Sequence, residues 1–160
     1  VVLKAVKKGV SGPEAIEAGK RVVEAGIKLS LMVILGLAGA DGSDRHARET
    51  ARAINEIKPN MLSALTLMLY RGSELLDQYE KGEFTPLSPQ GIMLELHKII
   101  SLVELPPEGH CLFRSNHVSN YVQLAATLPK DKDRLLGQIA QAADELGKWK
   151  DWDVYNNTRY

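Results

Sequence analysis

The chain has 160 residues, 44% of them hydrophobic and 25% charged, which is enough to bury the core of about one domain. Its 20 Lys and Arg balance 20 Asp and Glu, and this net charge of +0 argues against nucleic acid and anionic membranes as partners. The single cysteine, Cys111, excludes an internal disulfide and fits a reducing, cytoplasmic location. The longest apolar run, residues 29–37, is far shorter than the ~20 residues of a membrane helix, and no signal peptide is visible.

The amino-terminal segments predict a helix followed by a strand. The chain opens on an amphipathic helical pattern, so we expect it to be a fragment that begins within a helix. Residues 11–14 (SGPE) form a capping box with proline near the first helical position, and Gly26 is a natural helix stop. The nearly continuous apolar segment 28–35 predicts a strand that is covered on both faces, as in a parallel sheet.

The next segments complete a βαβ unit. We expect a second helix to be capped by Ser43 and ended by Pro59, with His46 on its surface. A second apolar run at 61–69 follows the first strand at the spacing of a strand, crossover helix and return strand, and it too is expected to be buried on both faces. The rest of the chain predicts a short helix within 71–82, a longer one from Ser88 and Pro89 to Pro106, a strand at 110–114, a helical patch near 121–128 and a helix at 132–148.

Alternating strands and helices predict a parallel α/β architecture, either doubly wound or part of a barrel. Ligands collect at the carboxyl ends of strands in both, which directs attention to residues 36–43, 70–73 and 115–120. Gly36 and Gly39 could let a ligand approach the backbone, with the next helix beginning near Ser43; alternatively they only make a tight turn.

Several segments resemble radical S-adenosylmethionine enzymes. Residues 34–39 (ILGLAG) are similar to the I-x-G-x-x-G segment that ends the fifth barrel strand of that family. Met32 and Ala40 depart from that segment, because glycine and glutamate often stand at these places. Residues 2–9 are similar to the helix after the fourth strand of that family, and residues 70–75 to the turn after its sixth strand. Residues 43–46, 82–89 and 115–136 resemble the subgroup of Fe-S oxidoreductases.

The resemblance implies a fragment of a partial (β/α)6 TIM-like barrel with parallel strands, plus carboxyl-terminal helices. Residues 1–105 would be the carboxyl-terminal half of the barrel and residues 106–160 an appended strand and helical region. The C-x-x-x-C-x-x-C motif is absent, so the 4Fe-4S cluster and the catalytic half would belong to an intact oxidoreductase parent. There the cluster and S-adenosylmethionine generate a 5′-deoxyadenosyl radical that abstracts a hydrogen atom from the substrate.

The resemblance also implies site residues. The adenine of S-adenosylmethionine would lie against Gly36, Leu37 and Gly39, with Met68 and Leu69 nearby, and no catalytic residue is expected in this chain. Candidate contacts to a small-molecule substrate are Tyr70, Arg71, Asn116, His117 and Asn120.

Other interpretations of these residues remain open. Asn116 and His117 could simply form a turn, with Ser119 capping a helix. His110, Cys111 and His117 lack the fourth ligand of a zinc site, so no metal site is expected.

A second functional class is a non-catalytic domain that binds a small ligand or serves as a scaffold. Its partner would be the missing barrel half or a second copy of the chain joined at the open sheet edge. The aromatic tail 149–160 is expected to pack back on the domain; balanced charge disfavours the alternative, stacking on nucleic acid.

Overall fold

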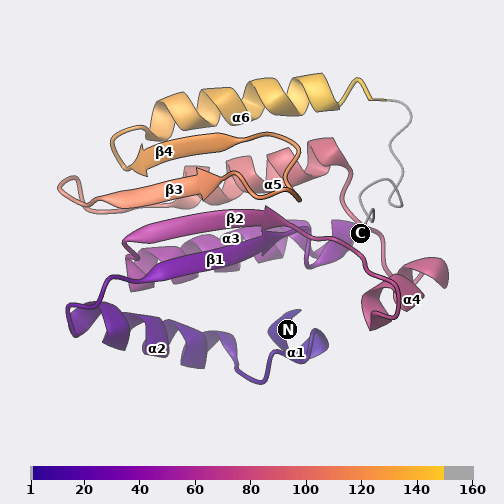
Figure 1. Ribbon diagram of the computed structural model, residues 1–160, viewed down its shortest axis with the longest axis horizontal. Helices are drawn as coiled ribbons and strands as arrows, with labels where there is room; N and C mark the ends of the chain where they lie inside the picture. Colours follow the sequence, from indigo (N-terminus) through magenta and orange to yellow (C-terminus); the bar gives the residue numbers. More distant parts are fainter. Residues whose placement is uncertain (1, 150–160) are drawn as a thin grey trace.

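The computed structural model describes residues 2–149 as a mixed α/β fold with one four-stranded sheet in the order β1-β2-β3-β4 (Figure 1). The strands are β1 (Ser30–Leu35), β2 (Met61–Thr66), β3 (Cys111–Ser115) and β4 (Leu124–Leu128). The helices are α1 (Val2–Ala5), α2 (Gly12–Glu24), α3 (Gly39–Ile57), α4 (Glu74–Glu80), α5 (Pro89–Leu102) and α6 (Lys132–Leu146). No helix within this part of the chain is long and apolar enough to cross a membrane.

The first three strands are parallel, as the alternating pattern predicts, and β4 pairs antiparallel with β3. The expected helical patch at 121–128 is wrong, because its second half is strand β4. Leu124, Ala126 and Leu128 alternate into the core along that strand. Pairing with β3 and burial of one face therefore override the helical preference of its leucine and alanine residues.

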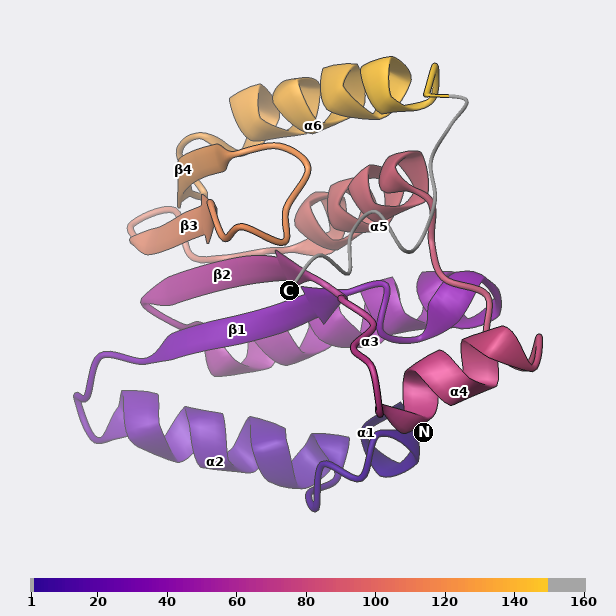
Figure 2. The same cartoon turned by 45° about the vertical axis from the view of Figure 1, so that its right-hand side comes forward.

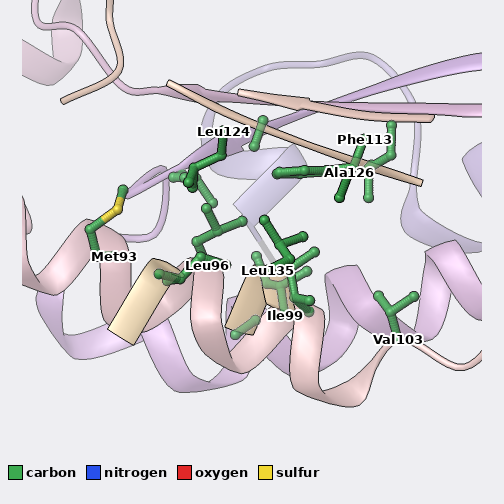
Figure 3. Packing of buried hydrophobic residues seen from close by; sticks show 14 of the residues in the cluster. Met93, Leu96, Ile99, Val103, Phe113, Leu124, Ala126 and Leu135 are labelled. Carbon is green, nitrogen blue, oxygen red and sulfur yellow. The ribbon is translucent and has the colours of Figure 1, made fainter. Parts of the chain in front are cut away.

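One face of the sheet carries the hydrophobic core. Helices α3 and α5 lie on this face, behind the strands in the view of Figure 1, and α6 packs against α5 and β4. Figure 3 shows the packing: Leu96 and Ile99 of α5 and Leu135 of α6 meet Phe113 and Ala126 of the sheet, and all five side chains are buried. The sheet and this core continue across the expected boundary between residues 105 and 106.

The opposite face of the sheet is open among the described residues. Met32 and Ile34 of β1 are 69% and 42% exposed, and Leu112 of β3 is 42% exposed. The expectation that β1 and β2 are covered on both faces is therefore wrong for this part of the chain. The apolar runs of β1 and β2 instead place apolar side chains on a face that no described helix covers.

Local capping signals place most helix starts correctly. Ser11 caps α2 with the full capping box, and Ser88 caps α5. The expected cap at Ser43 is wrong, because α3 already begins at Gly39 and Ser43 lies inside its second turn. The Ser43 hydroxyl is used in a different way, described below.

Candidate functional site

The carboxyl ends of β1, β2 and β3 lie along the same edge of the sheet because these strands are parallel (Figure 2). The segments that follow them are residues 36–39, 67–71 and 116–120. These segments contain every residue that the sequence assigns to a cofactor or substrate. Topology therefore brings the three segments to one edge, as expected for parallel strands.

The glycine turn after β1 is covered by the protein's own side chains. Both glycines have left-handed backbone, with φ of +78° at Gly36 and +67° at Gly39. A Cβ at Gly36 would lie 2.8 Å from Cδ1 of Ile92, and one at Gly39 would lie 2.9 Å from the Phe84 ring and 3.0 Å from the Thr85 carbonyl oxygen. Backbone conformation and close packing explain both glycines without a ligand.

The polar backbone groups of this turn are also engaged. The carbonyl of Gly36 accepts a hydrogen bond from the N–H of Gly39 at 3.0 Å, and the N–H of Ala40 donates to the carbonyl of Thr85 at 2.8 Å. The first turn of α3 therefore contacts the loop between α4 and α5. Because its Ala40 N–H is already paired there, this helix start is less able to bind an anion. Of the three adenine contacts expected in this turn, Gly36 and Gly39 are buried and Leu37 is partly exposed.

A buried carboxylate accepts hydrogen bonds from the same turn and from α3. Glu95 of α5 has a fully buried side chain. Its Oε2 accepts a hydrogen bond from the N–H of Gly36 at 2.7 Å, and its Oε1 accepts one from the Ser43 hydroxyl at 2.7 Å. Two donors to one carboxylate compensate for the cost of burying it, so Glu95 fixes the end of β1 against α3 and α5.

His46 belongs to this cluster. Its side chain is 13% exposed and its Nδ1 lies 3.3 Å from Oε1 of Glu95, in an orientation that gives no hydrogen bond. The expectation of a surface position is wrong, because α3 turns this side chain toward α5. Sequence reasoning missed Glu95 altogether, although a signal was present: it is an acid one helical turn from Ile92 and Ile99, on the apolar face of its helix.

The segment after β3 continues the pairing with β2. The N–H of Thr66 donates to Oγ of Ser119 at 3.1 Å, and the side-chain amide of Asn120 donates to the carbonyl of Ala64 at 2.9 Å. The Thr66 hydroxyl donates to Oδ1 of Asn120 at 3.1 Å. Ser119 and Asn120 therefore provide the hydrogen bonds that a longer β3 would have made, and the Asn120 amide is already committed within the protein.

Asn116 and His117 lie exposed in this segment. The N–H of Ser119 donates to Nδ1 of His117 at 3.2 Å, and the Ser119 hydroxyl lies 2.9 Å from the same nitrogen. His117 therefore contributes to the turn, as the alternative interpretation predicted. The helix cap expected at Ser119 is wrong, because strand β4 and not a helix follows this segment.

The segment after β2 divides between the core and the surface. Leu69 is buried in a second apolar cluster with Leu76, under α4. Met68 is partly exposed, and the Tyr70 hydroxyl lies 3.4 Å from its sulfur. Tyr70 and Arg71 are both exposed. Of the expected contacts in this segment, Met68, Tyr70 and Arg71 are accessible to a ligand.

No group of three or more His, Cys, Asp or Glu side chains within residues 2–149 could hold a metal ion. Cys111 points into the core at 2% exposure, and burial raises the pKa of its thiol to about 11. It therefore stays a protonated, inert thiol at neutral pH.

Comparison with known proteins adds no family to this description. No family model, curated protein or solved structure matches the chain. Its function must therefore be argued from the geometry.

The arrangement favours binding over catalysis. The carboxylate of Glu95 is buried and accepts two hydrogen bonds, and the Ser119 hydroxyl, although it lies 2.9 Å from Nδ1 of His117, is buried within the turn. The open face beside this edge presents an extended apolar surface, and most ligand-binding sites are lined by apolar side chains.

Proposed function

We propose that this chain is the carboxyl-terminal sector of a partial (β/α)6 barrel in a radical S-adenosylmethionine Fe-S oxidoreductase, and that its open sheet face forms part of the ligand-binding wall. The observation that carries the proposal is that, within residues 2–149, helices cover only one face of the sheet. Parallel sheets are normally buried on both faces, yet Met32, Ile34 and Leu112 are exposed here. In a barrel such a face lines the interior.

The order of the strands supports a barrel sector over a doubly wound sheet. The parallel strands β1, β2 and β3 are adjacent in chain order, and the helices α3 and α5 that connect them lie on the same face. A doubly wound sheet reverses its strand order and places helices on both faces, whereas a barrel keeps the order and places all helices outside.

Helix α2 gives a second, independent argument. It lies beyond the free edge of β1 and packs on α3, where Gly19 closely approaches Ile57 (Figure 1). The layer of helices therefore extends past the end of the sheet. In a barrel, a further strand would pair with β1 and would be covered by α2.

The cofactors of this enzyme class fit the chain only in part. A 4Fe-4S cluster does not fit, because the single cysteine is a buried thiol on the helix side of β3. Ile92 and Phe84 lie where a Cβ of Gly36 or Gly39 would stand, so Leu37, which is partly exposed, is the accessible contact of this turn for an adenine. The residues of this chain therefore serve as a binding surface, and the cluster would be held by the other half of the barrel.

The open face itself suits a flat, partly apolar ligand near the carboxyl edge. Ile34 and Leu65 are register partners on β1 and β2, and both belong to the open face. Met68 follows β2 on the accessible side of the edge. Together these side chains would exclude water from a ligand and hold it beside the reacting groups of the missing half.

The reading frame upstream of Val1 provides the first test. The proposal requires a C-x-x-x-C-x-x-C motif about 100 residues upstream, because each βα unit of such a barrel takes about 30 residues. The longer polypeptide, reconstituted with iron and sulfide and then reduced, should form 5′-deoxyadenosine from S-adenosylmethionine. Ile34→Asp should lower this rate by at least about tenfold, since a charge enters the apolar wall.

Ile27→Asp is the matched control. Ile27 is 60% exposed and precedes β1 outside the sheet, so the same substitution should leave the rate unchanged. An upstream frame without the cysteine motif, or an unaffected Ile34→Asp variant, would contradict the proposal.

A scaffold domain is the second candidate, favoured by the free edge of β1. This strand is SLMVIL, without a charge or proline to protect its edge, whose backbone groups pair with no other strand of the described chain. A second copy of the chain could pair with it. Sedimentation should then show a dimer, and Val33→Pro at the edge should give a monomer, whereas a monomer at high concentration would exclude this candidate.

A further inference from the structure

The open face of the sheet contains one charged strand residue. Side chains alternate along each strand, so the open face is defined by the residues opposite the core. Its members are Ser30, Met32, Ile34, Met61, Ser63, Leu65, Leu112, Arg114, Ala125 and Thr127. Arg114 is therefore a single cation on a face that is otherwise neutral and largely apolar.

The neighbours of Arg114 leave its guanidinium accessible. Its register partners are Ser63 on β2 and Ala125 on β4, both of which are small. Directly opposed side chains on neighbouring strands contact each other, so larger residues at these places would have covered the arginine stem and head. The Ser63 hydroxyl also gives this position a second polar group.

Arg114 has no anionic partner among residues 2–149. Its Nη1 donates to the carbonyl of Phe113 at 2.7 Å, and no carboxylate of the described chain pairs with it. A guanidinium carries five N–H donors in a planar fork that matches the two oxygens of a carboxylate or the oxygens of a phosphate. Among residues 2–149, the other donors of this guanidinium have no hydrogen-bond partner, so they can bind such a group.

We propose that Arg114, assisted by Ser63, is the recognition point for an anionic group on a small-molecule ligand that lies on the open face of the sheet. The anionic group is a carboxylate or a phosphate. This inference rests on the proposed function, because that proposal makes the open face part of a ligand-binding wall.

Anion titration of the chain itself tests this site separately from the radical chemistry. The Nε–H signal of Arg114 is followed by ¹⁵N–¹H correlation spectroscopy with sodium phosphate, sodium succinate and sodium chloride at equal ionic strength. Phosphate or succinate should move the Arg114 signal saturably, and chloride should not. The signal of Arg21, exposed on α2, should respond equally weakly to all three salts. A response of Arg114 that matches chloride would overturn the proposal.

Paired variants locate the site. Ser63→Asp places a carboxylate directly opposite Arg114 and should weaken phosphate or succinate binding by at least about tenfold, since the internal ion pair competes with the ligand. Ser30→Asp adds the same charge to the open face on β1, away from Arg114, and should change binding by less than about twofold. Equal effects of the two variants would show a general charge effect and overturn the assignment.

The outcomes for the two proposals are distinguishable. Saturable anion binding without formation of 5′-deoxyadenosine by the longer polypeptide would retain the Arg114 site and reject the radical enzyme. Formation of 5′-deoxyadenosine with no specific anion response at Arg114 would do the reverse.

Discussion

Among the polar side chains, Glu95 should contribute most to the stability of the fold. Its buried carboxylate accepts hydrogen bonds from the N–H of Gly36 and the hydroxyl of Ser43, both at 2.7 Å. Glu95→Ala removes both acceptors and leaves the N–H of Gly36 buried without a partner. The end of β1 then loses its connection to α5.

The size of this effect follows from the two hydrogen bonds. Each charge-assisted bond contributes about 1.5–3 kcal/mol, so the loss of both should lower the free energy of unfolding by about 3–6 kcal/mol. For a chain of this length the melting temperature should fall by about 10 °C. Glu95→Gln should cost less, because its amide oxygen can still accept from Gly36 and the Ser43 hydroxyl can rotate to accept from the amide nitrogen.

Urea unfolding and amide hydrogen exchange provide the assays. Exchange at Gly36 should be slow in the parent chain and much faster in Glu95→Ala. Glu49→Ala is the control, because Glu49 forms an exposed ion pair with Arg52 and should cost less than about 1 kcal/mol. If Glu95→Ala costs no more than this control, the argument for a carboxylate that locks the turn is wrong.

Three further predictions concern other parts of the molecule. Gly39→Ala should cost at least about 1 kcal/mol more than Gly82→Ala in urea unfolding, because both residues have positive φ but Gly82 has open space where Gly39 meets Phe84 and Thr85; equal costs would refute the packing argument. At pH 8 Cys111 should react with a disulfide reagent about 100-fold more slowly than in the unfolded chain, since its pKa is raised from 9.0 to about 11; its neutral thiol favours folding fully below pH 9, and this contribution is lost as the pH rises toward 11. Equal reaction rates would contradict the burial. The N–H of Thr127 and the guanidinium of Arg134 lower the pKa of Asp131 from 3.8, so the stabilisation relative to Asp131→Asn should be present above pH 3.8 and decline as the pH falls below it; a difference that does not change with pH would oppose this assignment.

Local signals in the sequence predicted most elements correctly, because capping and strand patterns act over a few residues. The capping box at Ser11 and the cap at Ser88 both begin helices, and the apolar runs give β1 and β2. The errors have long-range causes. Strand β4 forms because β3 offers it a partner. Ser43 lies inside α3, which begins at Gly39, and its hydroxyl donates to Glu95, 52 residues away in sequence.

The candidate site shows the same division. Sequence placed its residues at the carboxyl ends of the strands, but the structure shows that Asn120 and Ser119 complete the pairing with β2. The expected aromatic packing of the tail lies outside the described residues except for Trp149, whose ring is edge-on to Tyr121 at 6.3 Å. The remaining assignments of cofactor and substrate contacts stay predictions.

The sequence by itself determined the order of helices and parallel strands, since spacing and capping encode them locally. Tertiary structure decided which face of the sheet is open and which buried groups meet beneath the glycine turn. The physical reason is that an apolar strand has the same pattern whether one face or both are covered. Only the positions of α3, α5 and α6 show that Arg114 and its apolar neighbours lie on the uncovered side.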